Sequence, residues 1–134
     1  MTTQPNEISV LVVEDEAMIC EWVAETLIDA GFTVHAVGNA REALEYLASS
    51  SDFDALFTDI NLPGDMDGSQ LAVLARELRP DLTVIYASGR VRGLDPLMRV
   101  PGSTFIPKPY MPSEISSLLT RIVTPGASRP PVHP

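Results

Sequence analysis

The hydrophobic residues of the chain follow two different spacings. Short apolar runs rich in β-branched residues predict five strands, at residues 8–13, 32–37, 55–58, 83–87 and 104–106. Between these runs, apolar residues recur at the i, i+3, i+4 and i+7 positions of amphipathic helices. Three sets have this spacing: Ala40, Ala43, Leu44 and Leu47; Leu71, Leu74, Ala75 and Leu78; and Ile115, Leu118, Leu119 and Ile122. We therefore expect strands and helices to alternate along the chain.

Two of the connections between strands differ from the others. The first helix is marked by apolar residues at Ile19, Val23, Leu27 and Ala30. It is expected to end at Gly31, because glycine readily adopts the left-handed conformation found at helix ends. The fourth connection, residues 90–103, contains residues that disfavour helix, namely Gly93, Pro96, Pro101 and Gly102. It is predicted to hold only a short or irregular helix around residues 94–99.

The alternation of strands with crossover helices predicts the fold class. It is typical of a parallel sheet that is covered by helices on both faces and joined by right-handed connections. We therefore predict an α/β protein with a doubly wound, five-stranded parallel sheet in a three-layer α/β/α sandwich. The folded domain is placed at residues 7–123, after an N-terminal arm at residues 1–6. Residues 124–134 contain four prolines in eleven residues and are predicted to form a disordered, proline-rich tail.

Composition narrows the possible classes of protein. The 134 residues make about one domain, and 45% hydrophobic residues with a mean hydropathy of +0.11 are typical of a globular protein. No apolar run approaches the roughly 18 residues of a membrane span. The first residues resemble no signal peptide, so a cytoplasmic location is expected. Cys20 is the only cysteine, which excludes an internal disulfide, and we interpret it as a small buried residue of the first helix.

Charge excludes some partners and singles out one residue. Eighteen acidic against nine basic residues leave a net charge of −9, which argues against direct binding to nucleic acid or to an anionic membrane. Eight of the nine basic residues are arginines, and Lys108 is the only lysine. Chemistry that requires a compact, mobile ammonium group therefore has one candidate.

Polar residues follow the predicted strands at the edge where parallel sheets bind ligands. Glu14, Asp15 and Glu16 follow the first strand, Asp59 ends the third, and Ser88 and Lys108 follow the fourth and the fifth. The segment after the first strand has no glycine, which argues against a phosphate-binding loop. Clustered carboxylates repel one another unless a cation offsets their charge, and Mg²⁺ prefers such ligands. We therefore expect a Mg²⁺-dependent phosphoryl-transfer site with Asp59 as nucleophile and with Lys108 and Ser88 binding the phosphoryl oxygens.

Four motifs in this order resemble the response-regulator receiver domain of two-component signalling, the CheY-like superfamily. They are VLVVEDE, FTDINLPGDMDG, YASG and FIPKPY, and the resemblance covers about residues 7–123. It implies a flavodoxin-like fold with strand order 2-1-3-4-5. It also implies that Asp59 accepts a phosphoryl group from a sensor histidine kinase or a histidine phosphotransfer protein. Asp15 and Asp59 would hold Mg²⁺ directly, Glu14 through water, and Asn61 by its main-chain carbonyl.

The same resemblance assigns roles in the response to phosphorylation. Lys108 would pair with the phosphorylated Asp59, and Ser88 would move inward to bind the phosphate. Phe105, at the switch-aromatic position, would then turn from exposed to buried. The peptide bond before Pro109 would be cis. Asn61 and Arg90 stand where the family tunes the lifetime of the phosphoryl group.

We expect a single-domain switch rather than an enzyme with a separate substrate. If this is the whole natural chain, its output is expected to be contact with an unknown output protein, as a monomer or as a dimer, or the protein is expected to be a phosphate sink or shuttle. One alternative is a Mg²⁺-dependent phosphohydrolase, which is disfavoured because Asn61 stands where such enzymes carry a second acid. A second alternative is a degenerate receiver that acts as a binding module without phosphorylation. His35 and His133 are interpreted as neither metal ligands nor phosphate donors.

Simpler structural roles compete with these assignments. The acidic residues at positions 14–16 could merely favour the start of a helix, and Asp59 could be an ordinary turn residue. Lys108 could be a solvated side chain, Ser88 a turn hydroxyl and Phe105 a plain core residue. The convergence of the four motifs on one sheet edge favours the functional interpretation.

Overall fold

The computed structural model describes residues 8–49, 52–89 and 99–123. Three predictions lie outside these residues: the N-terminal arm, the short helix around residues 94–99 and the disordered tail at 124–134. In the described part, no helix combines the length and the apolar character needed to cross a bilayer.

Five strands and four helices alternate in the described residues as the hydrophobic spacing predicts. In chain order they are β1 (Ser9–Val13), α1 (Ala17–Asp29), β2 (Thr33–Val37), α2 (Ala40–Ser49), β3 (Ala55–Asp59), α3 (Gly68–Leu78), β4 (Thr83–Ser88), β5 (Thr104–Pro107) and α4 (Pro112–Ile122). The strand bounds differ from the prediction by about one residue at some ends, which is the usual uncertainty of such boundaries.

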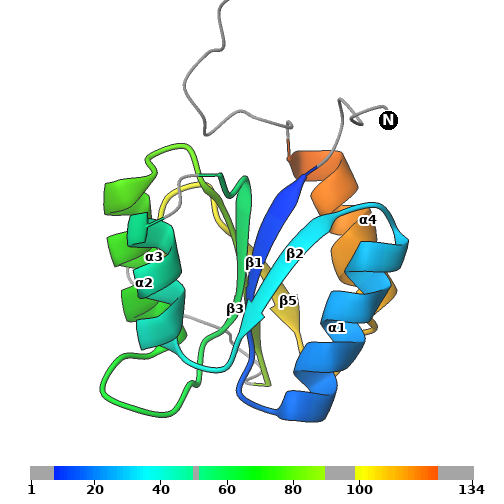
Figure 1. Ribbon diagram of the computed structural model, residues 1–134, viewed down its shortest axis with the longest axis horizontal. Coiled ribbons are helices and arrows are strands. Elements are labelled where there is room, and N and C mark those ends of the chain that lie inside the picture. The colour runs from blue at the N-terminus through cyan, green and yellow to red at the C-terminus, as the bar shows by residue number, and fades with distance from the viewer. Residues whose placement is uncertain (1–7, 50–51, 90–98, 124–134) are drawn as a thin grey trace, which may run out of the picture.

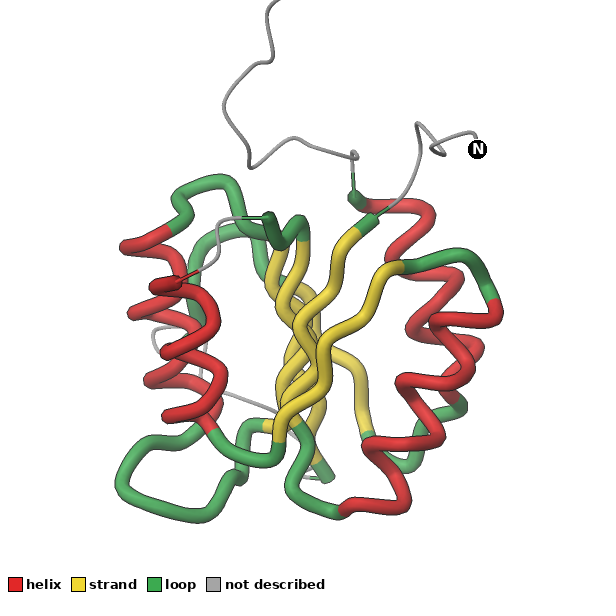
Figure 2. The backbone as a smooth tube through the Cα atoms, in the orientation of Figure 1, coloured by secondary structure: helices red, strands yellow, loops and turns green. Residues whose placement is uncertain are grey.

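The strands form one parallel sheet in the order β2-β1-β3-β4-β5. This order belongs to doubly wound, flavodoxin-like sheets, and the predicted fold class is confirmed. Helices α2 and α3 cover one face of the sheet, and α1 and α4 cover the other (Figures 1 and 2). The chain runs from β1 outward in both directions, so the order reverses between β1 and β3, where such folds bind ligands.

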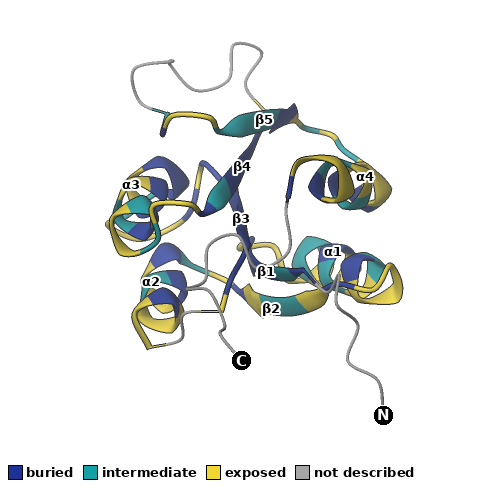
Figure 3. Ribbon diagram, turned by 90° about the horizontal axis from the view of Figure 1, so that it is seen from above, coloured by how far each residue is buried: buried dark blue, intermediate teal, exposed yellow. Residues whose placement is uncertain are grey.

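Each central strand contributes alternate residues to two separate cores. In β1, Val10 and Val12 pack under α1 and α4, whereas Leu11 and Val13 pack under α2 and α3. This two-residue alternation follows from the pleat of a strand. Because both faces are covered, all four residues are fully buried, and the strand is an uninterrupted apolar run. The buried residues therefore line the sheet and the inner sides of the helices (Figure 3).

Helix α1 ends as its sequence predicts. Gly31 has φ 101°, a conformation that favours glycine. Its N–H donates to the carbonyl of Ile28, and the N–H of Phe32 donates to that of Leu27. This pair of bonds is a Schellman motif. It turns the chain toward β2, and Phe32 is itself buried in the core under α1 and α4.

Helix α3 begins in direct contact with the end of β3. The Asp67 carboxylate accepts the N–H of Gln70 at 2.9 Å, and the Gln70 side chain accepts the N–H of Asp67 at 2.9 Å, which is a capping box. Gly68 donates its N–H to Ile60 at 2.8 Å. A Cβ at position 68 would overlap the backbone carbonyl of Asp59. Glycine is therefore required for this close approach.

Replacing Gly68 by alanine is expected to lower the free energy of unfolding by about 1–3 kcal/mol, since the added methyl group displaces the backbone at the end of β3. Gly38→Ala is the matched control, because a Cβ there meets no atom within 4 Å. The control should change stability by less than about 0.5 kcal/mol. Urea unfolding of the two variants measures both effects, and equal stabilities would contradict the steric argument.

Candidate functional site

Three carboxylates meet at the carboxyl edge of the sheet where the strand order reverses. Val13 of β1 lies opposite Thr58 of β3, so the next residue of each strand, Glu14 and Asp59, is brought to the same place. Asp15 follows at the start of the loop to α1. One carboxylate oxygen from each of the three acids lies within 4.8 Å of the other two. Glu14 and Asp59 are buried, whereas Asp15 is exposed to solvent.

Lys108 reaches this cluster from the end of β5. Its Nζ donates to Oδ2 of Asp59 at 2.7 Å and lies 3.8 Å from Oε1 of Glu14. Burial by itself lowers the pKa of the Lys108 ammonium, but the hydrogen bond to Asp59 and the charges of Asp59 and Glu14 outweigh it and raise that pKa. Lys108 is therefore firmly protonated, and it does not behave as a solvated edge lysine.

Glu14 takes part both in the cluster and at the start of α1. Its Oε2 accepts the N–H of Glu16, the residue just before the first turn, at 3.0 Å, but no acidic side chain caps α1. Burial raises the pKa of the Glu14 carboxyl, and the bond from Glu16 and the charge of Lys108 oppose that shift. A single ammonium faces three carboxylates here, so the cluster keeps excess negative charge when all three are ionised.

The donor set fits a small, hard divalent cation. All of the candidate ligand atoms are carboxylate or carbonyl oxygens, which Mg²⁺ prefers, and Mg²⁺ usually retains several waters. The exposure of Asp15 leaves one side of the cluster open to such waters. Asn61 is exposed, and its N–H donates to Oδ1 of Asp59 at 3.2 Å. The Asn61 backbone is thus adjacent to the cluster, although the structure itself assigns no ligand role to its carbonyl.

The other predicted site residues that the structure describes belong to β4, to β5 and to the loop after β5. Ser88 is the last residue of β4; it is buried, and its carbonyl accepts the N–H of Lys108 at 2.8 Å. Phe105 pairs in register with Tyr86 and is partly buried against the core under α2 and α3. The Lys108–Pro109 peptide bond is cis. Arg90 lies outside the described residues.

Two residues outside the site proper, His35 and Cys20, are also placed by the structure. His35 of edge strand β2 contacts Tyr46, with ring centroids 3.7 Å apart and ring planes tilted by 48°. His133 lies outside the described residues. Cys20 lies in α1 and packs against the core, but it is only partly buried, with its Sγ 3.9 Å from the carbonyl of Val37, so the expectation of a buried residue is met in part.

Sequence reasoning missed two residues that shape the site. Gly68 ends the motif FTDINLPGDMDG, but the motif does not indicate that this glycine lets α3 approach the Asp59 backbone. Tyr110 places its hydroxyl in a buried position, where it has no hydrogen-bond partner in the described part of the chain. Burial, followed by the charges of Glu14 and Asp59, raises the pKa of that hydroxyl. The motif FIPKPY included Tyr110, but no spacing rule indicated that its side chain would turn toward the carboxylates.

Known proteins are similar to this chain in sequence and in fold. The response regulator receiver domain family matches residues 10–120 of the chain. The transcriptional regulatory protein HprR of Escherichia coli (strain K12) is 33% identical over 118 residues, which are 84% of this chain and 49% of HprR. The sensor protein TorS of the same organism is 36% identical over 113 residues, which are 81% of this chain and 12% of TorS. The chain thus spans about half the length of HprR and a much smaller part of TorS.

A solved structure extends the likeness to three dimensions. The response regulator receiver protein from Sinorhizobium medicae WSM419 has a TM-score of 0.78 and 33% sequence identity, over 88% of this chain and 98% of that chain. The shared fold and the family match over residues 10–120 include both Asp59 and Lys108. The chain therefore belongs to the response regulator receiver domain family of two-component signalling.

Proposed function

We propose that Asp59 is the residue that accepts a phosphoryl group, delivered by a sensor histidine kinase or a histidine phosphotransfer protein. Receiver domains accept phosphoryl groups, and these are the partners of the family. The observation that carries the assignment is the 2.7 Å contact between Lys108 Nζ and Asp59 Oδ2 at the carboxylate cluster. It places a buried nucleophile beside the only lysine of the chain.

The site holds the nucleophile in one orientation. Oδ1 of Asp59 accepts the N–H of Asn61 and Oδ2 accepts from Lys108, so both carboxylate oxygens are held, which favours a productive geometry. As the P–O bond to Asp59 forms, the P–N bond of the donor phosphohistidine breaks, and its electron pair remains on the imidazole nitrogen. Lys108 stays protonated throughout and offsets the charge of the transferred group.

Glu14, Asp15, Asp59 and the Asn61 carbonyl are the residues we assign to Mg²⁺. The ion, when bound, offsets the negative charge of the carboxylates and of the phosphoryl oxygens. The donor set carries this assignment, because receiver domains bind Mg²⁺ through acidic residues and these three acids cluster within 4.8 Å. In this proposal Asp15 and Asp59 bind directly, and Glu14 binds through water.

The response is proposed to run along β4 and β5. The phosphoryl group adds about −1.5 to −2 charges at the cluster, and the Ser88 hydroxyl moves to bind it. Phe105 then exchanges its partly buried position for a fully buried one. Because β4 and β5 are hydrogen-bonded neighbours in the sheet, a movement of the β4 backbone at Ser88 acts directly on the strand that carries Phe105.

The output we propose is protein contact by a single-domain switch, as a monomer or as a dimer. Asn61 and Arg90 are proposed to tune the lifetime of the phosphoryl group. The phosphohydrolase alternative has less support, since Asn61 offers an amide where a second acid would be needed. A degenerate receiver has less support because Asp59 and Lys108 are in contact.

Asp59→Asn is expected to abolish phosphorylation and to keep the fold, because the amide has the shape of the carboxylate but is not a nucleophile. Intact mass after incubation with Mg²⁺ and acetyl phosphate should show one added phosphoryl group in the wild type and none in the variant. Asp65→Asn is the control, since Asp65 is exposed and pairs with Arg41 away from the cluster. Stoichiometric uptake by Asp59→Asn would contradict the assignment.

Asp15→Asn is expected to weaken Mg²⁺ binding by about tenfold or more, on the scale of altered metal shells. Because Asp15 is exposed, the substitution should leave the fold intact, and urea unfolding checks this directly. Calorimetric titration with MgCl₂ measures the affinity of both proteins. Asp65→Asn is the control and should bind Mg²⁺ with the affinity of the wild type. An unchanged Mg²⁺ affinity in Asp15→Asn would contradict the assignment of Asp15 as a ligand.

Lys108→Ala is expected to separate phosphorylation from the conformational response. Phosphoryl uptake should fall less than the conformational response does, because the nucleophile Asp59 is kept, while the amide shifts at Ser88 and Phe105 should be lost. NMR spectra with and without beryllofluoride and Mg²⁺ measure the response. Lys108→Arg keeps the positive charge but changes the shape of the donor group, so it tests whether charge alone supports the response. A full set of shifts in Lys108→Ala would show that Lys108 does not couple the site to β4 and β5.

A further inference from the structure

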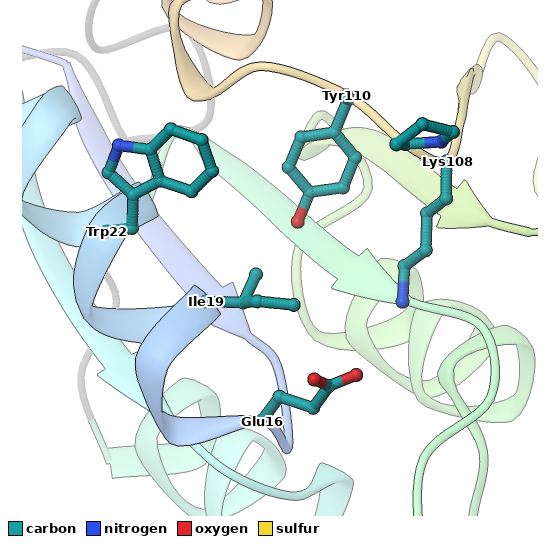
Figure 4. Close-up of a pocket in the computed structure, with 6 residues that line it drawn as sticks. Glu16, Ile19, Trp22, Lys108 and Tyr110 are labelled. Atoms are coloured by element: carbon teal, nitrogen blue, oxygen red, sulfur yellow. The ribbon is translucent and has the colours of Figure 1, made fainter.

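A cleft of about 420 Å³ lies beside the carboxylate cluster, between α1 and the loop that follows β5. The residues that line it are Glu16, Ile19, Trp22, Lys108, Pro109 and Tyr110. Trp22 from α1 and Tyr110 from the loop stand on opposite sides, with Ile19 between them (Figure 4). The hydroxyl of Tyr110 and the ammonium of Lys108 point in the same direction, toward the end of the cleft where Glu16 lies (Figure 4). Tyr110 thus directs a polar group toward the charged site from an apolar wall.

The Tyr110 hydroxyl is a buried polar group that lacks a partner. Its oxygen is shielded from solvent and makes no hydrogen bond within the described part of the chain. The ring packs edge-on against Phe57, with centroids 5.6 Å apart and ring planes at 89°, as part of the core under α1 and α4. A buried donor without an acceptor lowers the stability of a protein, and a phenylalanine ring would fill the same space without this cost. The packing of the ring therefore gives the hydroxyl no role.

Glu14 is the acceptor that the surroundings of this hydroxyl favour. Burial, followed by the charges of Glu14 and then of Asp59, raises the pKa of the Tyr110 hydroxyl, which therefore keeps its proton and remains a donor. Glu14 is only 2% exposed, so water has little access to its carboxylate. Its Oε2 accepts the N–H of Glu16, whereas its Oε1 lies 3.8 Å from Lys108 Nζ, beyond hydrogen-bond distance. Oε1 is therefore offset by a nearby charge but holds no hydrogen bond among the described residues.

The other acceptors near the hydroxyl are already engaged or are exposed to solvent. Oδ1 of Asp59 accepts the N–H of Asn61, and Oδ2 accepts from Lys108. Glu16 is exposed, so water can satisfy its carboxylate. A carboxylate offers about four acceptor sites. Glu14 can therefore accept from the hydroxyl and still accept the N–H of Glu16 and a water molecule bound to Mg²⁺.

We propose that the Tyr110 hydroxyl is a positioning group for Glu14, and that it donates a hydrogen bond to Oε1 once the phosphoryl group on Asp59 has attracted the Lys108 ammonium. This role depends on the phosphoryl transfer proposed above. The transferred group adds about −1.5 to −2 charges and competes with Glu14 for the single ammonium. Because a buried carboxylate that loses its cation is costly, a new bond from a neutral donor stabilises the phosphorylated site. Glu14 is then held in place to bind Mg²⁺ through water.

The two donors reach Glu14 from one segment of the chain. Lys108 and Tyr110 lie two residues apart in the loop after β5. Glu14 is held from the other side, because its backbone N–H donates to the carbonyl of Val37 at 3.1 Å. The cleft on one side of the Tyr110 ring provides space for the small movement that the new bond requires. The exchange of one donor for the other therefore involves side chains of a single loop and leaves the strands in register.

The chain has three tyrosines, which provide matched variants. Without Mg²⁺ and beryllofluoride, Tyr110→Phe should raise the urea midpoint, since it removes an unpaired hydroxyl and keeps the ring. Tyr86→Phe should lower the midpoint, because the Tyr86 hydroxyl accepts the buried N–H of Val100 at 3.1 Å. Tyr46→Phe should leave the midpoint unchanged, because Tyr46 is 40% exposed.

With Mg²⁺ at saturation, Tyr110→Phe should bind beryllofluoride about tenfold more weakly than the wild type, as expected for the loss of one hydrogen bond to a charged group. Calorimetric titration measures the affinity, and Tyr46→Phe should match the wild type. The effect of Tyr110→Phe should be smaller in combination with Glu14→Gln, since an amide is a weaker acceptor than a carboxylate. A purely structural role for Tyr110 would not combine a higher urea midpoint with a weaker affinity.

A lower urea midpoint for Tyr110→Phe would show that the hydroxyl already has a partner before phosphorylation, and it would overturn the proposal. An unchanged beryllofluoride affinity would do the same. An equal effect of Tyr110→Phe with and without Glu14→Gln would exclude Glu14 as the acceptor. A wild type that binds no beryllofluoride would instead contradict the phosphoryl transfer itself, and with it the role of Tyr110, so the two failures are distinguishable.

Discussion

The charge balance at the carboxyl edge of the sheet is the constraint on which the site depends. Glu14 and Asp59 are buried carboxylates, and the ammonium of Lys108, 2.7 Å from one and 3.8 Å from the other, is the cation that offsets them. Burying such charges without a partner would cost several kcal/mol. With one ammonium against three acids, the cluster remains suited to a divalent cation and then to a phosphoryl group, whose charge the same lysine can meet.

The sheet brings these charges together without help from any long loop. Alternate residues of β1 enter two different cores, so the strand cannot shift by one residue without exposing its apolar side chains. The register between β1 and β3 is therefore firmly held, and with it the proximity of Glu14 to Asp59. Gly68 adds a second restraint, since only glycine lets α3 begin against the carbonyl of Asp59. A rigid scaffold thus presents the Asp59 carboxylate.

The apolar cleft lies next to this charged site, and the two share Lys108. Pro109 and Tyr110 continue directly from the lysine that contacts Asp59, so any occupant of the cleft touches the segment that positions the ammonium. Trp22 and Ile19 supply the opposite wall from α1, whose first turn also follows Glu14 and Asp15 in the chain. The charged site and the apolar cleft are therefore built on the same two chain segments.

The sequence by itself determined the order of strands and helices, the end of α1 at Gly31 and the edge of the sheet where the chemistry lies, because these depend on local periodicity and on the general geometry of parallel sheets. Its motifs also pointed to Asp59 and Lys108, which lie 49 positions apart. Only the tertiary structure decided which atoms meet. Four features arise where segments distant in sequence pack together: the contact of Lys108 with both Glu14 and Asp59, the requirement for Gly68, the buried hydroxyl of Tyr110 and the cleft beside Trp22. No local sequence pattern predicts such packing, because it depends on the positions of several segments at once.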